Sequence, residues 1–309
     1  MEEHRPSTVV LNDRFPLSVI ILTRDEEVNI ADCLASVAWA DDAIVVDSGS
    51  KDRTLELARQ ARADVRIFSH PFQDFGDQRN WALDHAAPRH PWVLFLDADE
   101  RCTPACAEAI RRAVSQPEGK VGFYLTCRNF FLGRWIKRCT LYPSWQLRLL
   151  KLGCVRYRKE GHGQREVTDG PLGYIRQPYD HFGFSKGVSD WIARHNAYST
   201  NEVELIEQLR REPLRLGDLF KEPIQRRRCL KRLAARTGFR SVLRFLYLYC
   251  LRAGFLDGAP GLMFCLLRAA HEMHITVKLA EKRACGQSRG TQTLSSCGPV
   301  SHSTSGVSQ

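Results

Sequence analysis

Two carboxylates follow a short apolar segment in the first third of the chain. Asp97 and Asp99 come directly after residues 92–96, whose five apolar side chains predict a strand buried on both faces. If the chain leaves this strand extended, residues i and i+2 lie on the same side, so both carboxylates face one ligand. Carboxylates at the carboxyl edge of a sheet suit Mg²⁺ held together with substrate phosphates. The pair predicts a divalent-cation site, although an isolated Asp-x-Asp also serves to end a strand or cap a helix.

Further polar segments are expected at the same edge of the sheet. Two of them follow the first and second predicted strands, and a third precedes the strand that ends at Asp97. A carboxylate followed by Ser-Gly-Ser can accept hydrogen bonds from a nucleobase or a ribose, while the glycine lets the ligand approach the backbone. An arginine can bind a base or a phosphate through two donors. The ligand-binding candidates in these segments are Thr23, Asp25, Asp47, Ser48 and Arg79.

Strands and helices alternate along the first half of the chain. The last helix begins with the Thr-Pro pair typical of a helix start. This alternation predicts an α/β fold with a mostly parallel, Rossmann-like sheet flanked by helices. The predicted strands are residues 18–22, 43–46, 65–68 and 92–96, and the predicted helices are 28–39, 54–63, 78–86 and 103–114.

The second half of the chain has a different pattern. Residues 122–179 consist of short extended pieces separated by Gly, Pro and basic residues, which predicts a mixed, partly antiparallel extension. A helix is predicted at 185–209, and two apolar helical blocks follow at 242–251 and 262–267. Neither block reaches the roughly 18–20 apolar residues that a membrane-spanning helix needs.

Charge and cysteine content indicate partners and location. The chain has 309 residues and a net charge of +10, and between positions 210 and 252 thirteen Lys and Arg stand against three acids. Such a basic block suits an anionic partner such as a membrane surface.

The eleven cysteines are odd in number and form no C-x-x-C pair. With no signal peptide expected at the acidic N-terminus, we expect reduced thiols in a cytoplasmic protein without structural zinc.

These patterns divide the chain into five segments. Residues 1–16 form a flexible lead-in, and 17–120 form the ligand-binding α/β half. Residues 121–209 are expected to be an extension that carries the acceptor site and catalytic groups, and 210–284 a basic, amphipathic helical region. Residues 285–309 are rich in Ser, Gly and Thr, which predicts a disordered tail.

The order of the motifs resembles the family-2 glycosyltransferases, which have a GT-A fold. The resemblance covers residues 17 to about 280. In the first half it depends on Thr-Arg-Asp-Glu-Glu, Val-Val-Asp-Ser-Gly-Ser, Gln-Arg-Asn and Asp-Ala-Asp-Glu in this order. The second half resembles a bacterial subgroup that builds lipopolysaccharide cores and other surface glycans. The segments that carry this second resemblance are 131–136, 142–149, 161–166, 195–200 and 252–258.

The resemblance implies a nucleotide-sugar donor and Mg²⁺ or Mn²⁺ as cofactor. Thr23 and Asp47 would contact the base and ribose, and Arg79 the base or diphosphate. Asp25 departs from the family, which commonly has Asn there, and this puts a simple hydrogen-bonding role in doubt. The implied donor-binding residues are Thr23, Asp25, Asp47, Ser48, Arg79 and Asp97, and the implied metal ligands are Asp97 and Asp99.

An inverting, single-displacement transfer needs a base that takes a proton from the acceptor hydroxyl. We expect Glu166 to be this base, because it ends a motif with two glycines and Arg165 could keep its pKa low. A structural ion pair of Glu166 with Arg165 or with another nearby arginine is an equally good interpretation of the same residues. The alternative bases are Glu160, Asp180 and His162.

The expected partners are a nucleotide-sugar donor, a glycan or lipid-linked acceptor, and an anionic membrane surface on the inner face of the cytoplasmic membrane. A sugar nucleotidyltransferase is an alternative, but the glycine-rich phosphate loop expected after residues 18–22 is missing. A basic nucleic-acid-binding or anion-binding module is a second alternative from another class. The sequence contains no recognisable nucleic-acid-binding motif, so we expect no nucleic-acid partner.

Overall fold

The computed structural model describes residues 14–160, 163–215, 217, 229, 232–233 and 235–294, without the side chains of 286–294. Parts of the predicted segments lie outside these ranges. They are residues 1–13 of the lead-in, the candidate base His162, most of 218–231 in the basic block, and the tail from 295.

The first half of the chain forms the predicted α/β unit. Its four strands are parallel in the order β3-β2-β1-β4, and buried apolar side chains cover both faces of the sheet. The alternation is visible within β1, where Val19 and Ile21 pack toward one face and Ile20 toward the other. The strands are β1 (Phe15–Thr23), β2 (Ala40–Asp47), β3 (Arg66–Ser69) and β4 (Trp92–Asp97). The helices are α1 (Ile30–Ser36), α2 (Thr54–Ala61), α3 (Phe75–His85) and α4 (Pro104–Ser115).

The strand register brings the predicted polar segments together. Thr23 pairs with Asp47 across β1 and β2, and Leu22 pairs with Asp97 across β1 and β4. Since these residues end parallel strands, their side chains share the carboxyl edge of the sheet.

The middle of the chain extends this sheet with antiparallel strands. β8 (Trp145–Lys151) lies between β4 and β6 (Gly122–Phe131) and is antiparallel to both. β12 (Tyr179–His181) then pairs with β6 and with β5 (Glu100–Arg101), so the whole order is β3-β2-β1-β4-β8-β6-β12-β5. Two short strands, β7 (Arg134–Trp135) and β11 (Leu172–Tyr174), pair with β6. A separate hairpin of β9 (Arg156–Glu160) and β10 (Gly163–Val167) lies against α3.

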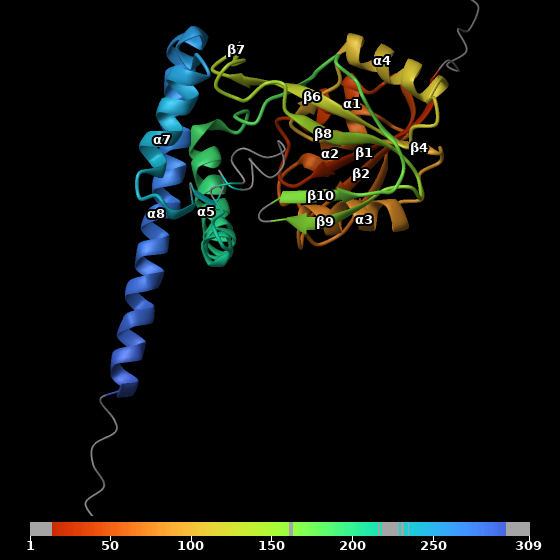
Figure 1. The fold of residues 1–309 in the computed structure, drawn as a ribbon. Coiled ribbons are helices and arrows are strands. Elements are labelled where there is room, and N and C mark those ends of the chain that lie inside the picture. Colours follow the sequence, from red (N-terminus) through yellow and green to blue (C-terminus); the bar gives the residue numbers. More distant parts are fainter. Residues whose placement is uncertain are drawn as a thin grey trace, which may run out of the picture.

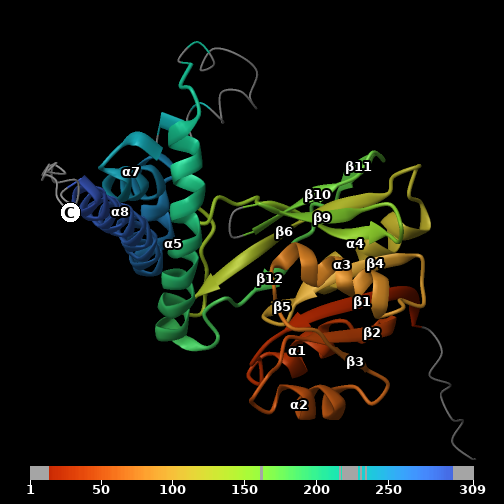
Figure 2. The ribbon, with the colours of Figure 1, turned by 90° about the horizontal axis from the view of Figure 1, so that it is seen from below.

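The last third is helical and lies beside the end of the sheet (Figures 1 and 2). It contains α5 (Gly187–Arg211), α7 (Arg240–Leu246), the short π-helix η2 (Tyr247–Leu251), the 3-10 turn η3 (Gly254–Asp257) and α8 (Gly258–Leu294). α8 continues ten residues into the stretch predicted as a disordered tail from 285. Each residue added to an existing helix gains a hydrogen bond without the cost of nucleation, so the polar composition does not end it at once.

Two sets of polar contacts hold the helical region in place. The Asp257 carboxylate accepts hydrogen bonds from the backbone N–H groups of Lys137, Arg138 and Cys139 at 3.2, 2.7 and 3.0 Å. Lys278 of α8 donates to the Asn196 carbonyl and side chain and to the hydroxyls of Ser199 and Thr200, at 2.7–2.9 Å. The residues of the 195–200 and 252–258 motifs thus join the helices to each other and to the strand extension.

Membrane-spanning potential is limited in the described part of the chain. No single helix there combines the length and apolar character needed to cross a bilayer. Residues Arg240–Leu251 and Gly254–Cys285 meet that criterion only as a pair, and the pair is bent by 72°.

Candidate active site

A cleft of about 1180 Å³ opens between the carboxyl edge of the sheet and the helical region. Its floor includes Thr23, Ser48, Asp97 and Asp99 from the ends of β1, β2 and β4. The β8 and β10 strands form one wall, and α5, α7 and α8 form the opposite side. The cleft therefore unites residues that are far apart in the sequence.

Asp97 is held by two buried arginines. Arg79 Nη2 lies 3.1 Å from Asp97 Oδ1, and Arg148 Nη2 lies 2.9 Å from Oδ2. Burial alone would raise the pKa of Asp97, but Arg148 and Arg79 lower it well below its usual range. Both carboxylate oxygens are thus engaged, and Arg79 also donates to Gln164 at 3.0 Å, which connects the sheet edge to β10.

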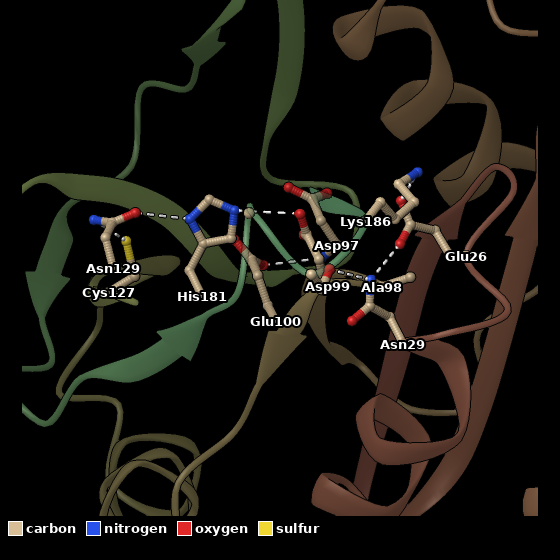
Figure 3. A network of polar contacts seen from close by, with 12 residues as sticks. Glu26, Asn29, Asp97, Ala98, Asp99, Glu100, Cys127, Asn129, His181 and Lys186 are labelled. Carbon is tan, nitrogen blue, oxygen red and sulfur yellow. Dashed lines mark hydrogen bonds and ion pairs between the residues drawn. The ribbon is translucent and has the colours of Figure 1, made fainter. Parts of the chain in front are cut away.

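Asp99 forms an ion pair with a histidine (Figure 3). Its Oδ2 atom lies 3.4 Å from His181 Nε2, while His181 Nδ1 lies 2.8 Å from the Asn129 side-chain oxygen. Burial alone would lower the pKa of His181, but the Asp99 carboxylate raises it well above its ordinary value. Asp99 and His181 form an ion pair in this structure. If a divalent cation took the place of the His181 proton, the pair would offer it an oxygen and a nitrogen ligand side by side.

A cation at this pair would take two ligands from the protein and the rest from elsewhere. Among the described residues, no group of three or more His, Cys, Asp or Glu side chains is arranged to hold a metal. Mg²⁺ and Mn²⁺ sites in nucleotide-using enzymes commonly take one or two protein ligands and complete the shell with substrate phosphates and water. The Asp99–His181 pair fits such a site.

The Asp-Ala-Asp-Glu loop is fixed by buried polar contacts. Glu100 lies 2.6 Å from Arg148 and accepts a hydrogen bond from the backbone N–H of Asp97 at 2.9 Å. Burial, offset in part by Arg148, raises the pKa of Glu100 to about 7. The backbone carbonyl of Asp99 accepts from the N–H of Phe182 at 2.8 Å. The segment that follows β12 therefore packs directly against the carboxylates.

A second network ties this segment to the loop after β1 (Figure 3). Lys186 Nζ lies 2.6 Å from Glu26 Oε1, and Asn29 donates to Glu26 at 2.6 Å and to Ser185 at 2.7 Å. Burial raises the pKa of Glu26, although Lys186 and Asn29 lower it in part. These contacts keep the two loops together at the mouth of the cleft.

The loop after β2 is held by the side chains that were expected to bind the donor. Asp47 accepts hydrogen bonds from the N–H groups of Gly49 and Ser50 at 3.0 and 2.9 Å. Asp25 has a left-handed backbone with φ of 54°, which Asp tolerates, and accepts from the N–H of Lys51 at 2.7 Å. Asp25 thus holds the loop after β2 and also lines the cleft.

Thr23 has an unused hydroxyl inside the cleft. Its side chain is buried and lines the cleft, and its Oγ1 atom has no hydrogen-bond partner within the described chain. A buried hydroxyl without a partner is costly, so it marks a place where a ligand completes the hydrogen bonding. Ser48, whose N–H donates to the Thr23 carbonyl, lines the cleft beside it.

The candidate bases lie in different surroundings. Glu166 lines the cleft from β10 and accepts a hydrogen bond from the Tyr124 hydroxyl. In the described residues it makes no ion pair with Arg165. Asp180 is bound by Arg128 through both oxygens at 2.6 and 2.9 Å, and Glu160 is exposed at the end of β9.

Three site residues had no assigned role in the sequence analysis: Arg148, His181 and Lys186. Arg148 falls within residues 142–149, one of the segments that carry the family resemblance. The resemblance assigned no role to this residue. His181 and Lys186 lie in no recognised motif, and only the pairing of β12 with β5 and β6 brings them to the cleft.

Comparison with known proteins relates the first half of the chain to a known family. Residues 18–162 match the family described as glycosyl transferase family 2. Residues 18–162, just under half of the chain, thus form a family-2 glycosyltransferase domain. The matched residues include most of the parallel half and the Asp97–Asp99 loop, so the matched domain supplies the floor of the cleft.

The glycosyltransferase resembles a protein of similar length. The lipopolysaccharide core biosynthesis glycosyltransferase LpsC of Rhizobium meliloti (strain 1021) is 26% identical over 264 residues, which cover 83% of this chain and 92% of LpsC. A TPR repeat-containing protein of Synechococcus elongatus is 38% identical over 103 residues, which are 33% of this chain and 25% of that protein.

Solved structures also match the glycosyltransferase. The S. aureus TarS 1–349 structure aligns with a TM-score of 0.43 at 14% identity, covering 87% of this chain and 92% of TarS 1–349. A glucosyl-3-phosphoglycerate synthase from Mycobacterium tuberculosis, solved with Mn²⁺ and uridine-diphosphate-glucose, aligns with a TM-score of 0.32 at 24% identity. This second match covers 37% of this chain and 44% of the synthase.

Proposed function

We propose that the protein transfers a sugar from a nucleotide-sugar donor, with Mg²⁺ or Mn²⁺ as cofactor, to a bacterial surface glycan. The observation that carries this proposal is the Asp99–His181 pair inside the cleft, with the oxygen and nitrogen donors 3.4 Å apart. The bound cation supplies positive charge that stabilises the leaving nucleoside diphosphate. The surface-glycan acceptor is inferred from the likeness to LpsC.

The chain's own residues bind and orient the donor. The Thr23 hydroxyl and Ser48 are placed to contact the nucleoside, because both line the cleft at the edge of β1 and β2. Asp47 acts by fixing the loop that carries Ser48. The Arg79–Asp97–Arg148 cluster makes the loop that carries Asp99 rigid, which keeps the reacting groups aligned.

Glu166 is proposed as the base in an inverting, single-displacement reaction. Its carboxylate accepts the acceptor hydroxyl proton as that oxygen bonds to the anomeric carbon and the bond to the diphosphate breaks. Tyr124 supports the assignment, because its hydroxyl donates to Glu166 and orients the carboxylate. Of the described candidates, Glu166 is the one that lines the cleft without being held in an ion pair.

The test of this function is donor turnover with and without metal. We expect one of a panel of UDP-, GDP-, dTDP-, ADP- and CMP-sugars to release its nucleotide slowly in water when Mg²⁺ or Mn²⁺ is present. Removal of the cation with EDTA should abolish this release, and added Mn²⁺ should restore it. Release at the same rate in EDTA would contradict the metal requirement, and no release from any donor would contradict the donor class.

We also propose that the protein binds the inner face of the cytoplasmic membrane through an apolar tip. The tip consists of Leu132, Leu251, Phe255 and Leu256, which are 57, 79, 51 and 60% exposed. The exposed basic residues beside it are Arg134, Lys137 and Arg138, and the hydrogen bonds of Asp257 hold the two segments together. Exposed apolar side chains next to basic ones suit an anionic lipid surface, where each basic residue contributes about 1 kcal/mol.

Vesicle sedimentation tests the apolar tip. We expect the protein to sediment with phosphatidylglycerol vesicles at about 0.1 M salt, and Phe255→Asp with Leu256→Asp to weaken binding about tenfold or more. Val277→Asp is the matched control, because Val277 is equally exposed on α8 but belongs to no basic cluster. Equal sedimentation of the tip variant and the wild type, or no sedimentation of either, would contradict the proposal.

A further inference from the structure

The helical side of the cleft is lined with arginines. Arg194 of α5, Arg244 of α7 and Arg268 of α8 all line it, and so do the aromatic side chains of His195 and Tyr198. These residues come from three helices, and Arg194 lies 50 positions before Arg244 and 74 positions before Arg268 in the sequence. The fold therefore concentrates positive charge on the side of the cleft that faces Asp99 and the β4 edge.

Two of the three arginines have partners in the protein. Arg194 Nε lies 2.8 Å from Asp190 Oδ2, and its Nη2 donates to the Gly183 carbonyl at 2.8 Å. Arg244 Nη2 lies 2.9 Å from Glu272, which it shares with Arg240 at 2.7 Å. One carboxylate thus serves two guanidinium groups, and the cluster keeps unbalanced positive charge.

Arg268 differs from its neighbours. It is half-buried, and in the described part of the chain its guanidinium makes no hydrogen bond or ion pair. Burial and repulsion by Arg244 lower its pKa, with Glu272 and Glu202 opposing this in part. A partly desolvated cation without a close partner is costly, so an anion in the cleft would be stabilised by it.

The neighbouring histidines neither neutralise Arg268 nor add positive charge to the arginine cluster. Burial and the nearby arginines lower the pKa of His195 to about 3 and that of His271 to about 4. Both rings are therefore neutral at physiological pH. The His195 ring stacks on Trp191 at 3.5 Å and is held in place by a contact of its Nδ1 with the Trp191 carbonyl.

We propose that Arg268, together with Arg194 and Arg244, binds an anionic substituent of the acceptor, a phosphate or a carboxylate. The inference rests on the proposed function, in which the diphosphate of the donor lies on the opposite side, near Asp99 and the carboxyl edge of the sheet. An arginine fork binds either anion through two parallel hydrogen bonds. The subsite would restrict the enzyme to acidic acceptors and orient their hydroxyl groups in the cleft.

Calorimetry with three small sugars tests the subsite and separates the two kinds of anion. Glucose 6-phosphate carries a phosphate, glucuronate a carboxylate, and glucose no charge. Each is titrated into the protein alone and into the protein saturated with the nucleoside diphosphate that binds it best. We expect at least one anionic sugar to bind about tenfold or more tightly than glucose in both states, and the stronger of the two identifies the substituent.

Variants of α8 link this binding to Arg268. Arg268→Gln should remove the preference for the anionic sugar while the nucleotide affinity stays within about twofold, and Arg268→Lys should restore part of the preference. Arg283→Gln, an exposed arginine on the same helix, should behave like the wild type. An unchanged preference in Arg268→Gln would overturn the proposal.

Two further outcomes are decisive. If saturation with nucleotide abolishes binding of the anionic sugar, the arginines serve the diphosphate of the donor and the acceptor subsite is wrong. If no nucleotide binds at all, the proposed function fails, and the titrations without nucleotide still decide whether the arginines bind an anion.

Discussion

Replacement of Asp99 by Asn should lower the rate of sugar transfer about 10³-fold or more. The amide keeps the shape of the side chain but loses the negative charge that, with His181 at 3.4 Å, is proposed to hold the cation. Without that cation the leaving diphosphate is not neutralised, so the loss should appear in kcat as well as in the apparent metal affinity. The measurement is donor turnover as a function of Mn²⁺ concentration.

The control for this prediction separates charge from folding. Asp169→Asn changes an exposed aspartate and should leave turnover and its metal dependence unchanged. Loss of the Asp99–His181 ion pair should lower the thermal midpoint of Asp99→Asn, but the variant should still unfold in one cooperative transition, since the buried Asp97–Arg148–Glu100 contacts remain. Turnover by Asp99→Asn within tenfold of the wild type would show that the cation, if required, binds elsewhere.

Replacement of Glu166 by Gln should lower transfer to the acceptor about 10³-fold, the usual contribution of a general base. Because Glu166 lies on β10, away from the β1 and β2 loops, binding of the nucleotide should be unaffected. The amide can still accept the hydrogen bond of Tyr124, so the local structure should persist. The measurement compares single-turnover transfer with nucleotide affinity in the same preparation.

The hairpin provides a matched control for the base. Glu160→Gln changes an exposed glutamate on β9, the partner strand of β10, and should leave transfer unchanged. Transfer by Glu166→Gln at the rate of the wild type, or loss of transfer in Glu160→Gln, would move the base to another residue.

The parallel half of the fold could be predicted because its signals are local. Strands β1 and β4 are continuous apolar runs buried on both faces, and such runs are distinct from the helices between them. The same logic predicted that Thr23, Asp47 and Asp97 share one edge, because parallel strands end together. These predictions follow from the order and direction of the strands, and they do not require knowledge of any side-chain contact.

The roles of individual side chains depend on contacts that the sequence does not encode locally. Asp97 was expected to contact the ribose or the metal, and whether it does remains a prediction, yet two arginines already engage both of its oxygens. One of them, Arg148, comes from β8, which enters the sheet next to β4 only through an antiparallel insertion. His181 reaches Asp99 by the pairing of β12 with β5.

In the helical last third of the chain, composition predicts that helices form but not where each helix begins. The apolar blocks at 242–251 and 262–267 were predicted to be helical with a turn between them, and residues 254–257 do form a 3-10 turn. However, residues 247–251 form a π-helix, and α8 begins at Gly258 and continues to Leu294. The close contacts of Gly254 and Gly261 explain this geometry, because a Cβ on either would lie 2.6 Å from a backbone oxygen. The arginine cluster follows from the packing of α5, α7 and α8 on one another, which no periodicity in the sequence predicts.

Metal-dependent nucleotide binding is the most direct test of the account. A thermal-shift panel of UDP, GDP, CMP, dTDP and ADP, each with and without Mn²⁺ or Mg²⁺, should include one nucleotide that stabilises the wild type only when the cation is present. At about 100 times its Kd, that nucleotide should add about 2.7 kcal/mol to the free energy of unfolding. Asp99→Asn should lose this increment. Stabilisation of equal size without metal, or none from any nucleotide, would contradict the assignment of the cleft as a metal-dependent donor site.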